Sequence, residues 1–182
     1  MGKADPERGG SPVLLQQRFE AQEDEHRLLN YRRGALLAAL FIALGAGMDW
    51  VAFGTSSAQS PEGVVLTLFL LRMACSCGLL FVLFLLYRVR STSRRTLHLL
   101  GHLVALIPMV TIHGMLSETG GGGSPYYAGL NLVMVGTVLL LRWRCIDGVI
   151  SSTLCIVGYL AVALNTATVS YTHLRAHETA YY

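Results

Sequence analysis

Residues 64–87 read VVLTLFLLRMACSCGLLFVLFLLY, with a single charged side chain, Arg72, in the whole stretch. A helix needs about 20 such residues to cross a hydrocarbon layer roughly 30 Å thick. Four other stretches of the chain are similarly apolar and of similar length. The five predicted spans are 34–53, 64–87, 97–116, 126–141 and 146–167. The sequence therefore predicts an all-α protein, a polytopic transmembrane helical bundle with five up-and-down spans.

Composition supports a membrane protein. Hydrophobic residues make up 53% of the 182 residues and charged residues only 14%, which argues against a soluble globular domain. The net charge of +3 comes from arginines between the spans. No basic stripe alternates with aromatic residues, as it does in single-strand binders, so we expect no nucleic-acid partner. The expected partner is the lipid bilayer.

Arginines lie at every second junction between spans. The junctions at 54–63 and 117–125 contain no Lys or Arg, whereas the others hold Arg32, Arg33, Arg88, Arg90, Arg94, Arg95, Arg142 and Arg144. The positive-inside bias places the N-terminus in the cytoplasm, and the first span is expected to be an uncleaved anchor. Aromatic residues at span ends predict interfacial belts: Trp50, Phe53, Tyr126 and Tyr127 on the outer side, Tyr87 and Trp143 on the inner side.

The segment before the first span divides into two parts. Residues 1–12 are rich in Gly, Pro and charge and are expected to be disordered. Residues 13–33 mix apolar and charged positions at helical spacing, which predicts a cytoplasmic helix that continues into the first span. This lead-in helix is either solvated on all sides or packed against another cytoplasmic part, including its twin in a dimer.

Two ionisable residues, Asp49 and Arg72, lie within predicted spans joined by a short loop. Each is costly inside a membrane unless it is paired. Antiparallel packing brings their depths within reach of the long arginine side chain, so we predict an intramembrane ion pair. In the alternative, Asp49 meets interfacial water while Arg72 extends outward alone.

The third span carries three histidines, His98, His102 and His113, which share one helix face. A haem held by two histidines needs one on a facing helix, and no other predicted span contains any, so we expect no cofactor. His98 and His102 are then interfacial and solvated, and His113 is a neutral side chain bonded inside the bundle.

The cysteines do not predict a metal site or a disulfide framework. Cys75 and Cys77 are two residues apart on a helix and point to different sides. Cys145 lies beside Arg144 at an interface, where it is either palmitoylated or an ordinary thiol. No nucleophile has a base at suitable spacing, and no phosphate-binding loop is present, so no catalytic residues are expected.

The last residues differ from the rest of the chain. Residues 169–179, VSYTHLRAHET, resemble the translation of a sequencing-library adapter. We therefore expect 169–182 to be a non-native tail that replaces a sixth span. His173, His177 and Glu178 have helical spacing that would otherwise suggest a metal site. On this interpretation they form none.

The stretch SPYYAGLNLV at 124–133, followed by Trp143, resembles the fourth span of N-terminal six-helix membrane domains in bacterial sensor histidine kinases and adenylate/guanylate cyclases. Asp49, Arg72 and the polar lead-in helix are also similar to that family, over about 19–168 in all. The resemblance implies a sensory or anchoring domain in the bacterial inner membrane. The effector module would lie outside this fragment, which has no enzymatic site of its own.

The resemblance also implies a homodimer that responds to a stimulus whose ligand it does not identify. Small residues in the first span, Gly34, Ala38, Gly45 and Ala46, would permit close helix contact. The alternative is a fragment of a transporter or a stand-alone membrane protein. A transporter would favour broken helices in paired halves. Pro108 is one possible break, but it has no visible counterpart.

Overall fold

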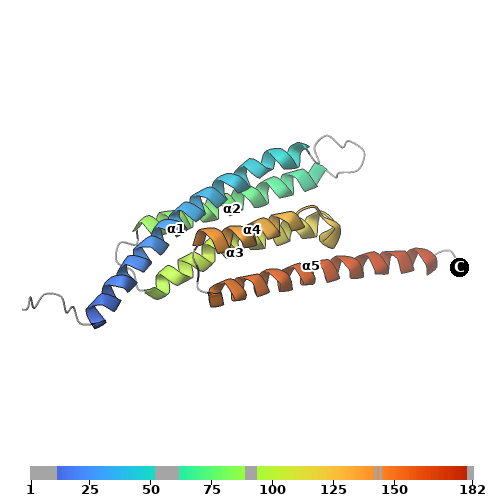
Figure 1. Ribbon diagram of the computed structural model, residues 1–182. Coiled ribbons are helices and arrows are strands. Elements are labelled where there is room, and N and C mark those ends of the chain that lie inside the picture. The colour runs from blue at the N-terminus through green and yellow to red at the C-terminus, as the bar shows by residue number, and fades with distance from the viewer. Residues whose placement is uncertain (1–11, 52–61, 89–93, 142, 144, 180–182) are drawn as a thin grey trace, which may run out of the picture.

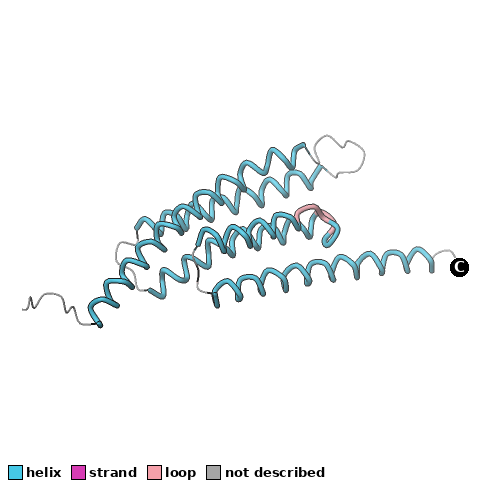
Figure 2. Tube along the Cα trace, viewed as in Figure 1, coloured by secondary structure: helices cyan, strands magenta, loops and turns pink. Residues whose placement is uncertain are grey.

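The computed structural model describes residues 12–51, 62–88, 94–141, 143 and 145–179, with the side chains of the last helix described as far as Thr166. This part of the chain is built from α-helices and one short 3-10 turn, and it contains no strand (Figure 2). The predicted all-α class is confirmed. The predicted disordered segment lies outside the described residues, except for Pro12, which begins the first helix.

The helices run up and down, so that their junctions alternate between two ends of the bundle (Figure 1). They are α1 (Pro12–Asp49), α2 (Glu62–Arg88), α3 (Arg94–Glu118), α4 (Tyr127–Leu141) and α5 (Cys145–Thr179), with the 3-10 turn η3 (Gly121–Gly123) between α3 and α4. We call the end that holds Arg32, Arg88 and Arg94 the arginine end. The end that holds η3 is the glycine end.

Four of these helices are long and apolar enough to cross a membrane: Val13–Asp49, Gly63–Arg88, Arg94–Glu118 and Cys145–Thr166. The predicted span at 126–141 also forms a helix, but α4 has only 15 residues. That is shorter than the roughly 20 residues a full crossing needs. Each of the five predicted spans therefore forms an α-helix, and α4 is the shortest of the five, because its polar junctions lie closer together than those of its neighbours.

The predicted lead-in segment and first span form one uninterrupted helix, α1, of 38 residues. The lead-in part is tied to the start of α3. Arg94 of α3 forms ion pairs with Glu20 at 3.3 Å and with Asp24 at 3.7 Å. Arg27 is buried beneath this contact and donates to Glu23 at 2.5 Å. These ion pairs therefore join the lead-in part of α1 to the first residue of α3.

Helices α1 and α2 lie side by side (Figure 1) because small residues let them approach. Ala35 and Ala39 of α1 are buried, and Ser76 of α2 donates to the carbonyl of Ala39 at 3.1 Å. At the arginine end, Arg32 donates to the carbonyl of Leu86 from two nitrogens, at 2.7 and 3.1 Å. This contact satisfies a carbonyl in the last turn of α2 that has no partner within its own helix.

Two apolar clusters form the core. The first joins α1, α2 and α3 near the arginine end and includes Tyr31, Leu79, Leu86 and Leu100. The second joins α3, α4 and α5 near the glycine end and is built around Met109, Ile112, Leu116, Leu130 and Cys155. Helix α3 contributes to both clusters and is the central helix of the bundle.

Helix α5 continues as backbone to Thr179. The predicted non-native tail therefore starts within a helix, and its last residues, 180–182, lie outside the described part of the chain. The side chains of His173, His177 and Glu178 also lie outside it. The structure therefore does not bear on the metal interpretation of these residues.

Candidate functional site

The structure brings the two predicted intramembrane charges together. Arg72 of α2 donates to both carboxylate oxygens of Asp49 at the end of α1, from Nε at 2.5 Å and from Nη2 at 2.8 Å. The side chains are 12% and 5% exposed, respectively. Bidentate, charge-assisted bonds of this kind are among the strongest hydrogen bonds in proteins. Burial makes the pair costly to break.

A third side chain completes this site. The hydroxyl of Tyr126, just before α4, donates to Oδ1 of Asp49 at 2.5 Å. The Arg72 guanidinium also lies 5.8 Å from the centre of the Tyr126 ring. The carboxylate is therefore bonded from two sides. The cluster of Asp49, Arg72 and Tyr126, which we call the Asp49 cluster, joins α1, α2 and the start of α4.

The backbone of α1 makes room for the arginine. Gly45 lies directly against the Arg72 guanidinium, so that a Cβ at this position would overlap it. Arg72 also donates from Nη1 to the carbonyl of Ile42 at 3.2 Å. Gly45 and Ile42 are thus the features of α1 that seat the guanidinium beside Asp49.

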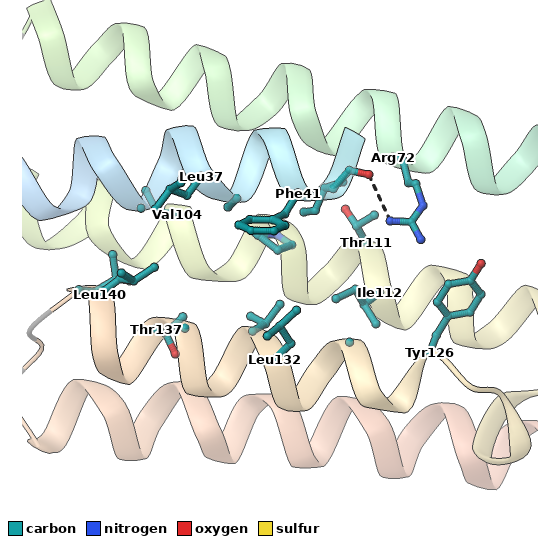
Figure 3. A pocket seen from close by; sticks show the side chains of 18 of the residues that line it. Leu37, Phe41, Arg72, Val104, Thr111, Ile112, Tyr126, Leu132, Thr137 and Leu140 are labelled. Atoms are coloured by element: carbon teal, nitrogen blue, oxygen red, sulfur yellow. Dashed lines mark hydrogen bonds between the residues drawn. The ribbon is translucent and has the colours of Figure 1, made fainter. Parts of the chain in front are cut away.

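A cavity of about 330 Å³ extends from the Asp49 cluster toward the arginine end (Figure 3). Helices α1, α3 and α4 supply most of its wall, and Arg72 and Tyr126 form its polar end. The other labelled lining residues are mostly apolar: Leu37, Phe41, Val104, Ile112, Leu132 and Leu140, with Thr111 and Thr137. The hydroxyls of both threonines are bonded to carbonyls of their own helices.

The exposure of the lining residues shows where this cavity opens. Val104, Pro108 and Met115 of α3 are buried and form its floor. Phe41 of α1 is 67% exposed and Leu132 of α4 is 68% exposed, so these two stand at its rim. The cavity therefore opens sideways, between α1 and α4, rather than at either end of the bundle.

The three predicted histidines all contact α5 but do not form one site. His98 and His102 lie 3.9 and 3.5 Å from the carboxylate of Asp147, and the Trp143 ring packs against His102 at a centroid distance of 5.0 Å, tilted by 44°. His113 lies nearer the glycine end. Its ring nitrogens are 2.7 Å from the carbonyl of Met109 and 3.1 Å from that of Cys155.

No described group of three His, Cys, Asp or Glu side chains has the arrangement of a metal site. His113 meets only carbonyl oxygens, and a neutral imidazole can donate to just one of its two. Cys75 and Cys155 are buried, whereas Cys77 and Cys145 are exposed. Among the described residues, the Asp49 cluster and the cavity beside it form the candidate site.

Sequence reasoning missed Tyr126, Gly45 and Asp147. Tyr126 is interpreted as a belt residue because it stands at a span end, yet it bonds Asp49. The small residues on the predicted contact face of α1 pack against other helices of the same chain. Gly34 packs on Leu141, where an added Cβ would lie 3.1 Å from a methyl group, and Gly45 packs on Arg72. No sequence pattern shows these contacts, because they depend on which helices become neighbours.

This arrangement places a cavity of ligand size against a buried charged cluster. The cavity is walled mainly by α1, α3 and α4, and its polar end is the charged cluster that joins α1, α2 and the start of α4. A ligand at that end would touch groups whose bonds hold α1, α2 and α4 together. No protein-family model matches the chain, and neither a curated protein nor a solved structure matches it.

Proposed function

We propose that this chain is the membrane-embedded sensory domain of a bacterial signal-transduction protein, with a histidine kinase or a nucleotide cyclase as its effector. The observation that carries the proposal is the position of the Asp49 cluster beside a laterally open cavity. A domain that only anchors an effector needs apolar helices. It does not need a buried ion pair next to a space of ligand size.

Helix α1 supports the proposal because it links this site to the polar end of the protein. It runs unbroken from Asp49 back to the lead-in segment, where Glu20 and Asp24 meet Arg94. A shift of Asp49 would therefore move the lead-in part against α3. A packed helix that moves as one body is a standard way to carry a small displacement over a long distance.

The proposed location is the bacterial inner membrane, with the N-terminus in the cytoplasm. The arginine asymmetry of the junctions supports this orientation. The lead-in part of α1 exposes Leu15 and Phe19, four residues apart on one helix face, each more than 60% accessible. An exposed apolar face on an otherwise polar helix supports a homodimer or contact with the effector.

The function is tested on the gene for this chain, sequenced independently, and on the protein that it encodes. A kinase or cyclase module in the same reading frame as the membrane helices would support the proposal. In nanodiscs, Asp49→Asn should change the activity of that module at least several-fold, because the cluster would bias the signalling state. An inverted second half in place of an effector would contradict the proposal, as would an activity indifferent to Asp49→Asn in correctly folded protein.

The orientation is tested by thiol labelling in intact cells, on a chain whose four native cysteines are replaced. Single cysteines at Ser57 and at Gly123, which is exposed and has open space for a side chain, should react with a membrane-impermeant reagent, and one at Ser93 should not. Reaction at Ser93 before cell lysis would reverse the proposed topology.

A further inference from the structure

We infer that the cavity between α1, α3 and α4 binds a neutral, single-chain amphiphile whose hydrogen-bond-accepting head lies at Arg72 and whose hydrocarbon chain extends toward Gly34. The inference rests on the proposed sensory function and names the class of ligand for it. It follows from the size of the cavity, the chemistry of its two ends and the charge balance of the Asp49 cluster.

The size of the cavity suits a small amphiphile. Its volume of about 330 Å³ lies at the lower end of the roughly 300–1,000 Å³ typical of small-molecule sites. At about 30 Å³ for each water-sized group, it holds on the order of ten methylene-sized units. Its lining runs along α3 from Val104 to Met115, roughly 16 Å at about 1.5 Å per residue. One chain fits this shape, whereas a two-chain phospholipid does not.

The walls away from Arg72 suit a hydrocarbon chain. Most lining side chains are apolar, and three glycines, Gly34, Gly129 and Gly136, keep the space open. A Cβ at Gly136 would meet no atom within 4 Å. The lateral opening between Phe41 and Leu132 lets a chain arrive from the surrounding lipid without crossing water.

The polar end suits a hydrogen-bond acceptor. Arg72 has five N–H groups; its bonds to Asp49 and to the carbonyl of Ile42 use three of them, and the Tyr126 side chain is a further hydrogen-bond partner. The guanidinium also forms part of the cavity wall. A carbonyl oxygen placed there would accept from an N–H group that these bonds leave over, without breaking the ion pair.

The charge balance favours a neutral head over an anionic one. Asp49 already neutralises Arg72 through two hydrogen bonds, so the cluster as a whole carries no net charge. An anionic head would leave one unmatched negative charge in a low-dielectric site, which is strongly unfavourable. A neutral ester or ketone avoids this cost.

The test uses a methyl decanoate analogue with a diazirine on its chain, crosslinked to the whole chain in phosphatidylcholine nanodiscs. Unlabelled competitors are compared at equal mole fraction in the bilayer: methyl decanoate, decane and decane-1-sulfonate, which stays anionic. We expect crosslinks on α3 and α4 peptides that line the cavity. Methyl decanoate should compete at least tenfold better than either of the others.

Variants locate the site. Gly136→Leu fills the cavity and should reduce specific crosslinking at least tenfold. The matched control, Gly148→Leu, adds the same side chain at a position of α5 that also has open space but lies away from the cavity. It should crosslink like the wild type. In the double variant Asp49→Asn, Arg72→Gln, the preference for the ester over decane should disappear.

Three results would overturn the inference. Equal competition by decane would mean a plain hydrocarbon slot filled by lipid chains. Stronger competition by the sulfonate would mean an anion site, and unchanged crosslinking in Gly136→Leu would place the probe elsewhere. The proposed function fails separately: if the ester binds in the cavity but the full-length protein's activity does not respond to it, the site stands and the sensory function does not.

Discussion

The Asp49 cluster and the group formed by His98, His102 and Asp147 are both polar contacts between helices, but they differ in tightness. In the first, the arginine and carboxylate are 12% and 5% exposed and their bonds are 2.5–2.8 Å long. In the second, the side chains are 15–27% exposed and the closest approaches are 3.5 and 3.9 Å. The first contact is tight and buried, whereas the second is longer and partly exposed.

The difference comes from what surrounds each group. Gly45, the carbonyl of Ile42 and the hydroxyl of Tyr126 hold the charges of the Asp49 cluster in a single arrangement. Asp147 lies in the first turn of α5, where a carboxylate is already stabilised by the helix dipole without any histidine. We therefore expect the helices to depend on the Asp49 cluster for their packing, and to depend little on the histidine group.

The largest expected effect is the loss of one partner of the ion pair. Asp49→Asn should lower the free energy of unfolding in detergent micelles by roughly 3–5 kcal/mol, because Arg72 stays buried without its counter-charge. Arg72→Gln should cost a similar amount. The double variant should recover part of the loss. Simple addition of the two single losses would show that the residues do not interact.

Gly45→Ala sharpens the comparison by disturbing the cluster without removing any of its groups. The new Cβ overlaps the guanidinium, which the bonds to Asp49 hold in place, so we expect a loss of about 1–3 kcal/mol. The matched control is Gly47→Ala, where a Cβ meets nothing within 4 Å. It should gain up to about 1 kcal/mol from helix propensity. In an Arg72→Gln background, Gly45→Ala and Gly47→Ala should change the free energy of unfolding in the same direction.

Tyr126→Phe tests the third member of the cluster. Removing a hydrogen bond to a buried carboxylate should cost about 1.5–3 kcal/mol in thermal or denaturant unfolding. Tyr127→Phe is the control, because Tyr127 is 53% exposed, and it should change stability by less than about 0.5 kcal/mol. Equal effects would mean that Tyr126 acts as an interfacial aromatic residue rather than through Asp49.

The smallest expected effect comes from the histidine group. Asp147→Asn should lower the free energy of unfolding by less than about 1 kcal/mol, since long and partly exposed polar contacts contribute little. A loss as large as that of Asp49→Asn would remove the contrast between the two regions.

Apolar length and the expense of charge in a membrane predict the helices and the pairing of Asp49 with Arg72. Both arguments use only the order of residues along one or two neighbouring helices. Tyr126 contacts a residue 77 positions away, and His98 contacts one 49 positions away (147 − 98). These contacts depend on where α4 and α5 pack, which no periodicity in the chain shows. The cavity could not be predicted for the same reason.

The shortness of α4 bears on how the domain would respond to the bilayer itself. Its 15 residues cover about 22 Å at roughly 1.5 Å per residue, against a hydrocarbon thickness of about 30 Å. A short helix is accommodated by local thinning of the bilayer, at a cost of fractions of a kcal/mol for each ångström of mismatch. Because α4 is also one wall of the cavity, thicker membranes should strain the same helix that the ligand touches. Lipid chain length and ligand would then act on this domain through one shared element.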